Sequence, residues 1–480
     1  MATFSSLEVG RRALLAHNFG LDVTSNNIAN TNTEGYSRRQ AIFSEAAPYL
    51  TQGYYIGTGV DGQSLRSFRE EYLDREVRKI NGKETSYEND IEIFNAIETI
   101  LREPTDNNLG EVVNNLLNIF EELALQPESI GLREVLLHKA QTLVERFNSA
   151  SNDLEALRVQ AYEDIKQDVT KANKLIEEIA GYNKVLGLTK DRNGQDSLTY
   201  VDKREVAIEE LAKLGNVTVT YDDNRTANVF MNGINLVNQE EAHYLKEFEN
   251  VDGNTGESSL NIMLYDKNKE LYIDIDPKAG TFYSNLKHYN VTLDRRDSSL
   301  GFSILKELDS YVSAFAEKIN GFLVGAYGLN DYGTTAAPGR ILFTSDSGEI
   351  LASNIKVSSS VSDPADIPLS ATAGTPGNSD IARSISRISQ DGTFLAGQTP
   401  SEFYSNFIGK VANLANDAVN GEKAIKLVSQ QLNSQRNSIM SVNEDEEAIN
   451  LIKYQKNFEA ASRIITMSNE ILSTLVNLGR

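Results

Sequence analysis

A seven-residue apolar repeat occurs at both ends of this 480-residue chain. The repeat is carried by Leu7, Leu14, Leu21 and Ile28 near the start, and by Leu451, Phe458, Ile465 and Leu472 near the end. Apolar residues at this spacing form the seam of a coiled coil. The repeat therefore predicts two terminal helices that pack on each other and form an assembly interface with neighbouring subunits.

The charge of the chain limits its partners. The formal net charge is -22, which argues against nucleic acid and against an anionic membrane surface. Residues 1–50 differ from the rest, because four basic side chains balance four acidic ones there. A neutral end on an acidic chain favours self-association. No run approaches the roughly 18 apolar residues of a membrane span, so no membrane insertion is expected.

The absence of cysteine excludes disulfides, thiol catalysis and zinc–thiolate sites. The first twenty residues lack the basic segment, apolar core and small-residue cleavage site of a signal peptide. We therefore expect a chain that is either cytoplasmic or exported by a route without a cleaved signal.

Helical periodicity accounts for most of the chain. We expect helices over 4–29, 69–101, 109–125, 132–180, 284–327, 401–440 and 444–478. The helix over 132–180 has apolar residues at steps of four and three, with a register slip before Ile165, and would be roughly 70 Å long. Its length predicts a helical bundle with the shape of a rod.

Three segments have the pattern of strands or loops. Residues 36–68 alternate like extended chain, and residues 215–280 predict a small inserted β region with a turn at Asn232-Gly233. Residues 328–378 are rich in Gly, Ser, Thr and Pro, which predicts loops or short strands. The expected fold class is mainly α with an inserted β region, in an elongated, hairpin-like molecule with paired terminal helices.

These segments group into four expected domains. They are a terminal coiled-coil assembly domain (1–50 with 440–480), a helical bundle (51–199 with 284–327 and 379–439), a β-rich region (200–283) and a short loop and β excursion (328–378).

Patterns that could support catalysis or ligand binding are weak. Residues 57–62 match the glycine spacing of a dinucleotide-binding loop, but such a loop leads into a helix, and the residues that follow alternate like a strand. The four histidines form no metal-binding pair, and no nucleophile-elbow motif occurs. The acidic residues 444–447 fit the first turn of a helix better than a metal site. We expect no enzyme, no metal and no cofactor, although a Ser-His-Asp triad assembled by the fold stays open.

Residues 26–38, Asn-Asn-Ile-Ala-Asn-Thr-Asn-Thr-Glu-Gly-Tyr-Ser-Arg, closely resemble the N-terminal signature of the flagellar axial proteins of the rod, hook and hook-associated structures. The motif residues singled out for a structural role are Asn26, Asn27, Ile28, Ala29, Asn30, Gly35 and Tyr36. The amides and Gly35 are expected to fix a turn between an inner helix and the outer part of the molecule.

Further segments resemble one branch of these proteins, the hook-associated protein 1 family of the hook–filament junction. The segments are 108–127, 133–140, 147–148, 202–204, 211–220, 442–448 and 454–455. This resemblance covers both ends and most of the helical middle. Relatives generally carry a sizeable outer β domain, so the short segment 328–378 indicates that this domain is reduced or absent.

The family resemblance implies a structural protein that joins hook to filament as a homo-oligomeric ring, with the terminal helices lining the inner tube. It implies export through the flagellar type III apparatus and an extracellular location in the flagellum. The implied partners are the hook protein, a second junction protein or filament protein, and a cytoplasmic export chaperone bound to the C-terminal helical region.

Three other interpretations remain open. A flagellar hook or distal-rod protein would share the N-terminal motif but should lack the long helical block of residues 108–180. A secreted hydrolase or adhesin on a flagellar-type scaffold would need a compact domain with a pocket. A cytoplasmic coiled-coil scaffold would need neither the motif nor the avoidance of cysteine.

Overall fold

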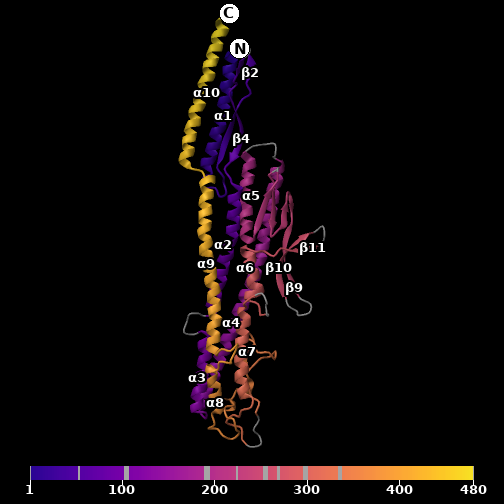
Figure 1. Ribbon diagram of the computed structural model, residues 1–480, viewed down its shortest axis with the longest axis vertical. Helices are drawn as coiled ribbons and strands as arrows, with labels where there is room; N and C mark the ends of the chain where they lie inside the picture. Colours follow the sequence, from indigo (N-terminus) through magenta and orange to yellow (C-terminus); the bar gives the residue numbers. More distant parts are fainter. Residues whose placement is uncertain are drawn as a thin grey trace.

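The computed structural model shows an elongated molecule of long helices with both chain ends at one end of its long axis (Figure 1). It describes residues 2–51, 54–101, 108–188, 195–222, 225–251, 258–266, 271–295, 301–332 and 338–478. The first helix, α1 (Ala2–Ala29), packs along the last, α10 (Glu444–Leu478). The predicted fold class and hairpin-like shape are therefore confirmed.

Below the terminal pair, a shaft of long helices extends toward the other end of the molecule (Figure 1). The shaft contains α2 (Glu71–Leu101), α3 (Leu109–Leu125), α4 (Ile130–Leu188), α5 (Gln195–Leu214), α7 (Ile304–Leu323) and α9 (Pro400–Met440). The helix α4 has 59 residues, which corresponds to about 88 Å at the rise of an α-helix. The continuous long helix predicted from the sequence is thus confirmed and extends beyond both predicted ends.

Capping residues set several of these helix ends. The side chain of Asn108 accepts a hydrogen bond from Glu111 N and begins α3. Thr399 and Glu402 form a capping box at the start of α9, where Pro400 occupies a position that needs no backbone donor. Asn443 accepts hydrogen bonds from the first backbone amides of α10, so the acidic run 444–447 begins a helix.

The strands form small antiparallel sheets beside the helices. One ribbon pairs β1 (Arg39–Glu45) with β4 (Val60–Ser67), and a hairpin pairs β2 (Tyr49–Thr51) with β3 (Tyr54–Ile56). β4 begins at Val60, inside the glycine segment 57–62, so this segment leads into a strand and not into the helix that a dinucleotide-binding loop requires, as the sequence indicated.

The inserted β region contains two sheets. The first has the order β5-β6-β7-β8, with β5 (Val217–Tyr221), β6 (Ala227–Met231), β7 (Ile234–Asn238) and β8 (Glu241–Ala242). The second has the order β11-β10-β9, with β9 (Tyr244–Val251), β10 (Ser258–Asp266) and β11 (Leu271–Asp274). Residues 328–378 form loops with only two short strands, β12 (Phe343–Thr344) and β13 (Lys356–Val357), in their described part.

Two segments differ from the sequence-based expectation. Residues 200–214, which lie within the expected β-rich region of 200–283, form part of the helix α5, and this helix packs on the sheets of that region. The helix expected over 284–327 is interrupted: α6 (Gly280–Lys287) ends in a π-helical turn (His288–Thr292), and α7 begins again after Ser303. The π-turn closes when Leu293 N donates to His288 O, and the Ser303 side chain caps α7. A short helix, α8 (Asp380–Ser386), precedes α9.

Two hydrophobic clusters stabilise the shaft. The first joins α3, α7 and α8 to the beginnings of α4 and α9 and to residues of the 328–378 excursion. The second joins the later half of α4 and α5 to the inserted β region. Among the described residues, neither cluster contains a side chain of α1 or α10. The terminal helices therefore depend on contacts of their own.

None of the helices in the described part of the chain combines the length and the apolar character that crossing a membrane requires.

Candidate assembly interface

At two positions of the antiparallel contact between α1 and α10, a glycine of α1 faces a larger residue of α10. A Cβ atom added to Gly10 would lie 2.9 Å from Ile465 Cγ1, and one added to Gly20 would lie 2.8 Å from the ring of Tyr454. Glycine at these positions lets the two helices approach closely. The Oγ atoms of Ser6 and Ser468 are 3.1 Å apart farther along the pair. The line of contact on α1 thus includes Ser6, Gly10 and Gly20.

The residues of the predicted repeat lie on or beside this contact. All eight are half-buried: Leu7, Leu14, Leu21, Ile28, Leu451, Phe458, Ile465 and Leu472. On α10 the repeat coincides with the contact at Ile465, whereas on α1 the leucines directly follow contact residues, as Leu7 follows Ser6 and Leu21 follows Gly20. Sequence reasoning missed the small residues of α1, because glycine and serine do not register in an apolar repeat.

Asn27, in the motif at the end of α1, is fully buried and joins three segments. Its Nδ2 donates to Arg39 O at 2.8 Å and to Glu447 Oε2 at 3.1 Å. Its Oδ1 accepts from Arg39 N at 3.1 Å and from Tyr36 Oη at 2.8 Å. The amide therefore ties α1 to β1 and to the beginning of α10.

The other motif residues shape the turn after α1. Asn30 Nδ2 donates to Asn26 O, and Tyr36 Oη donates to Asn26 Oδ1. Gly35 has a φ of 72°, and a Cβ there would lie 2.1 Å from Val206 Cγ2, so this position requires glycine. Ala29 is exposed and Ile28 is half-buried. These contacts lie in the turn that leads from α1 to β1.

Tyr36 is electrostatically coupled to the surrounding charges. Burial is the largest cause that raises its pKa to about 12, and the carboxylates of Asp202 and Glu447 act in the same direction. The guanidinium of Arg39, which stacks over the Tyr36 ring at 4.9 Å, acts against them. The hydroxyl therefore stays protonated at neutral pH and can donate to the two asparagines.

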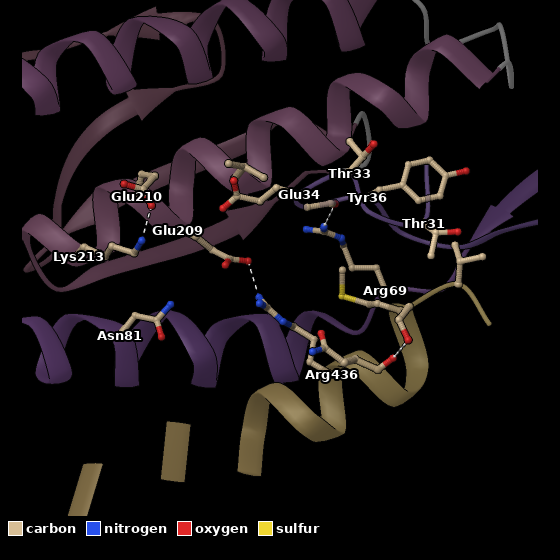
Figure 2. Close-up of a pocket in the computed structure, with 16 residues that line it drawn as sticks. Thr31, Thr33, Glu34, Tyr36, Arg69, Asn81, Glu209, Glu210, Lys213 and Arg436 are labelled. Carbon is tan, nitrogen blue, oxygen red and sulfur yellow. Dashed lines mark hydrogen bonds and ion pairs between the residues drawn. The ribbon is translucent and has the colours of Figure 1, made fainter. Parts of the chain in front are cut away.

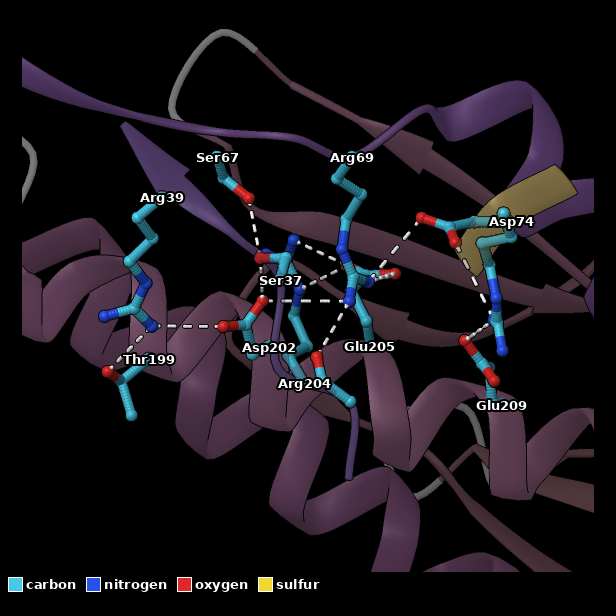
Figure 3. Close-up of polar contacts among 12 residues, drawn as sticks. Ser37, Arg39, Ser67, Arg69, Asp74, Thr199, Asp202, Arg204, Glu205 and Glu209 are labelled. Atoms are coloured by element: carbon cyan, nitrogen blue, oxygen red, sulfur yellow. Dashed lines mark hydrogen bonds and ion pairs between the residues drawn. The ribbon is translucent and has the colours of Figure 1, made fainter. Parts of the chain in front are cut away.

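A buried ionic network joins the terminal segments to the shaft (Figure 3). We call it the joint network, and its members are Ser37, Arg39, Ser67, Arg69, Arg78, Thr199, Asp202, Arg204, Glu205 and Tyr221. Arg39 Nη2 lies 3.1 Å from Asp202 Oδ2 and from Thr199 Oγ1 on α5. Ser37 Oγ donates to Asp202 Oδ1 at 2.7 Å and lies 2.6 Å from Ser67 Oγ. Burial raises the pKa of Asp202, although these partners act to lower it. Strands β1 and β4 are thereby attached to α5.

The centre of the joint network is Glu205, which is fully enclosed. Its Oε2 lies 3.3 Å from Arg78 Nη2 and accepts from Tyr221 Oη at 2.8 Å, while Oε1 lies 2.9 Å from Arg204 Nη2. Burial acts to raise the pKa of Glu205, but the charges of Arg204, Arg78 and Arg69 outweigh it and the pKa is lowered. Residues from α2, α5 and β5 are fixed together at this point.

A second ionic contact fastens α10 directly. Arg38 Nε lies 2.9 Å from Glu447 Oε1 and Arg38 Nη1 lies 3.0 Å from Glu446 Oε2. The backbone of Arg38 also donates to Met440 O at the end of α9. The short connection between α9 and α10 is thus held against the segment that follows α1.

Comparisons with known proteins agree with this architecture. The flagellar hook-associated protein FlgK helical domain matches residues 94–340, which is more than half of the chain. The chain belongs to the FlgK family of flagellar hook-associated proteins. Two shorter matches cover the ends: the flagella basal body rod protein domain matches residues 7–36, and the flagellar basal body rod FlgEFG protein C-terminal domain matches residues 434–478.

Individual FlgK-family relatives span nearly the whole chain. Flagellar hook-associated protein 1 of Bacillus subtilis (strain 168) is 26% identical over 509 residues, which cover 99% of this chain and 98% of the relative. The Escherichia coli (strain K12) protein of the same name is 23% identical over 542 residues, covering 95% and 96%. The solved flagellar hook junction protein FlgK from Burkholderia pseudomallei is 12% identical, covers 76% of this chain and all of its own, and has a TM-score of 0.63, which shows a shared fold.

The FlgK-family assignment gives the described geometry its context. This chain is a hook-associated structural component of the bacterial flagellum, and its relatives are structural flagellar proteins. One rod-type match covers most of α1 with its motif and the other contains α10, and these are the two helices that the structure pairs. The FlgK helical-domain match distinguishes the chain from a hook or distal-rod protein.

A cavity of about 440 Å³ lies beside the joint network (Figure 2). Figure 2 shows that Arg436 and Lys213 at its wall are each paired with a carboxylate of α5, Arg436 with Glu209 and Lys213 with Glu210. Arg436 Nη1 lies 2.6 Å from Glu209 Oε1. The charges of Arg436 and Lys213 are thus neutralised by carboxylates of the chain itself. Within the described parts of the chain, no group of three or more His, Asp or Glu residues is placed to hold a metal ion.

A serine, a histidine and an aspartate do meet in the core, but in an order unsuited to hydrolysis. Asp90 lies between the other two: His288 Nε2 is 2.8 Å from Asp90 Oδ1, and Ser284 Oγ donates to the same oxygen. In a hydrolase triad the histidine lies between serine and aspartate and activates the serine. Here the cluster is buried and joins α6 and the following π-turn to α2.

Electrostatics support the structural role of this cluster. Burial acts to raise the pKa of Asp90, but the hydrogen bond from His288, the charge of Lys287 and the hydroxyl of Ser284 lower it to about 2. Burial lowers the pKa of His288. Asp90 is therefore an ionised acceptor at neutral pH, with donors supplied by the helix opposite.

Proposed function

We propose that this chain is a non-enzymatic junction protein that joins the flagellar hook to the filament as a ring of identical subunits. The paired terminal helices would supply the contacts between subunits. Hook protein would lie on one side of the ring, and a second junction protein or filament protein on the other. The chain would be extracellular in its working state.

The observation that carries this proposal is the apolar surface that α10 leaves uncovered. Its exposed large apolar side chains are Ile449, Ile452, Ile464, Met467, Ile471, Leu475 and Val476. An isolated helix with such a surface gains stability by packing against further helices. Since α1 covers only one face of α10, neighbouring subunits are the natural source of additional packing.

The half-buried repeat residues take the same role in the proposal. Leu7, Leu14, Leu21 and Ile28 would pack partly on α10 and partly on a neighbour, as would Leu451, Phe458, Ile465 and Leu472. Motif residues Asn26 to Tyr36 would set the angle between this helix pair and the shaft. The domain division follows: 1–50 with 440–480 would assemble, and the bundle, the β-rich region and the 328–378 excursion would lie outside the axis.

Export through the flagellar type III apparatus completes the proposal. The family's place in the flagellum supports this route, and the chain contains no cysteine. A cytoplasmic chaperone would cover the C-terminal helical region before export. Apolar side chains at helical spacing on α10 support such capture, because a groove can bind anchors spaced three and four residues apart.

Immunogold electron microscopy of isolated flagella tests the proposed position. Antibodies against the shaft should label one narrow band between hook and filament in the wild type, and no band in a strain that lacks the gene. Labelling along the whole filament or along the hook would contradict a junction ring.

A further inference from the structure

The hairpin formed by β2 and β3 lies at the end of the molecule that holds the terminal helices (Figure 1). Large apolar side chains of this hairpin are exposed. Tyr54 and Tyr55 are 75% and 76% exposed, and Leu50 is 61% exposed. Tyr49 and Ile56, which pair across the hairpin, are exposed as well. Such a concentration of uncovered aromatic and aliphatic side chains marks an interaction surface.

The chain holds the base of this hairpin in place. Ala46 N donates to Gly59 O at 2.9 Å, and Thr58 Oγ1 donates to Ala47 O at 2.9 Å. A Cβ on Gly59 would lie 3.4 Å from the backbone of Val9, so the base of the hairpin rests on α1. The exposed side chains are therefore presented by an anchored element.

A second apolar surface lies on α10 at the same height along the molecule. Its side chains follow helical spacing and are exposed by 40–61%: Ile464, Met467, Ile471 and Leu475. We call this set the α10 stripe. Ile464 and Ile465 adjoin Gly10, the direct neighbour of the Val9 on which the hairpin base rests. The hairpin and the α10 stripe thus share one level on the long axis.

Charge also distinguishes these two surfaces from the rest of the chain. Residues 46–60 contain no charged side chain, and residues 464–476 contain one, Glu470. The whole chain carries a net charge of -22, so two copies repel each other over most of their surface. Electrostatic repulsion between two copies is smallest where the surfaces in contact are both neutral and apolar.

We infer that the hairpin of one subunit docks on the α10 stripe of the next subunit. The inference rests on the proposed ring and names the two surfaces that would form its contact. Each subunit offers both surfaces, so the contact is heterologous and repeats from subunit to subunit. Because both surfaces share one level, successive subunits can follow a rotation with little axial shift, as a ring requires.

Disulfide crosslinking tests this contact, because the chain has no cysteine of its own. The variant Tyr55→Cys/Met467→Cys is produced in cells that lack the wild-type gene, and isolated flagella are treated with a mild oxidant. A link between subunits gives dimers and longer ladders on a non-reducing gel, whereas a link within one subunit leaves monomer. The matched control is Tyr55→Cys/Ser473→Cys, since Ser473 is also exposed on α10 but lies off the α10 stripe.

The inference predicts at least tenfold more dimer from the Tyr55/Met467 pair than from the control. Equal dimer from both pairs, or none while the variant chain is present in flagella, would overturn it and leave the proposed ring intact. If even the wild-type chain is missing from isolated flagella, the proposed function fails and the inference fails with it.

A charge substitution tests the same contact without cysteine variants. Met467→Glu should reduce incorporation into flagella at least tenfold, while Ser473→Glu should incorporate normally. Both purified chains should show wild-type thermal transitions, because both sites are exposed. Wild-type incorporation of Met467→Glu would overturn the inference.

Discussion

Replacing Asn27 by leucine should loosen the attachment of the terminal helix pair to the shaft. Leucine has a similar size but offers no hydrogen bond, so Arg39 N and Arg39 O both lose a buried partner. Glu447 Oε2 also loses the amide, but its carboxylate keeps the guanidinium of Arg38 and is left out of the sum. An unsatisfied buried polar group costs about 1–3 kcal/mol, which gives roughly 2–6 kcal/mol for the two groups. Burial of the leucine returns about 1.5–3 kcal/mol of this. The expected net loss is about 2 kcal/mol of local stability.

Hydrogen–deuterium exchange measures this loss where it occurs. Amides of β1, of the motif and of the first turns of α10 should exchange about thirtyfold faster in Asn27→Leu, since 1.4 kcal/mol corresponds to a factor of ten. Amides in the middle of α4 should be unchanged, because α4 belongs to the two hydrophobic clusters.

The matched control for this experiment is Asn32→Leu. Asn32 belongs to the same motif but is exposed, so its exchange pattern should match the wild type. Unchanged exchange in Asn27→Leu, or equal acceleration in both variants, would refute the conclusion that the buried amide fastens the terminal pair.

Three further predictions concern other parts of the chain. Gly35→Ala should destabilise the turn by about 1–2 kcal/mol through its positive φ alone, and further through the clash of the new Cβ with Val206. Adding Val206→Ala should recover only the stability lost to the clash, as thermal unfolding would show. Ionised Asp90 stabilises the folded state above the pKa of about 4 that the group has in the unfolded chain, and this stability is lost as pH falls toward its folded pKa of about 2. In Asp90→Asn, the free energy of unfolding should therefore vary with pH by about 2 kcal/mol less over that range. Ile465→Asp should leave the thermal unfolding of the shaft nearly unchanged, because Ile465 lies outside both hydrophobic clusters. The same substitution should abolish filament formation, whereas cells that carry the control Thr466→Asp, at an exposed site, should swim normally.

Local signals predicted the long helices well. The helix over 109–125 begins and ends where the sequence indicated, because Asn108 caps its start and Pro127 follows its end. The same held for the beginnings of α9 and α10, where capping residues precede a periodic run. These signals act within a few residues, so one sequence suffices to find them.

Long-range contacts account for the main error in the fold. The helix expected over 284–327 has suitable apolar spacing, but it is interrupted by the π-turn after α6. Asn290 in that turn exchanges two hydrogen bonds with the backbone of Leu260 on β10. Hydrogen bonds to a strand 30 residues away cannot be predicted from local periodicity.

The candidate site was predicted in part. The repeat located the two helices that pair, but the closest contacts of α1 use Gly10 and Gly20, which carry no apolar signal. The joint network was not predicted at all, because Arg39 and Asp202 are separated by 163 residues. Charged residues that meet in the interior look like ordinary surface residues in a sequence.

The most direct test of a hook–filament junction role is electron microscopy of cells that lack this gene, combined with an assay of filament protein in the culture medium. If the chain forms the junction, these cells have complete hooks without filaments, and filament protein is lost to the medium. Missing hooks would place the chain lower in the axis, at the rod or hook. Normal filaments would contradict a junction role altogether.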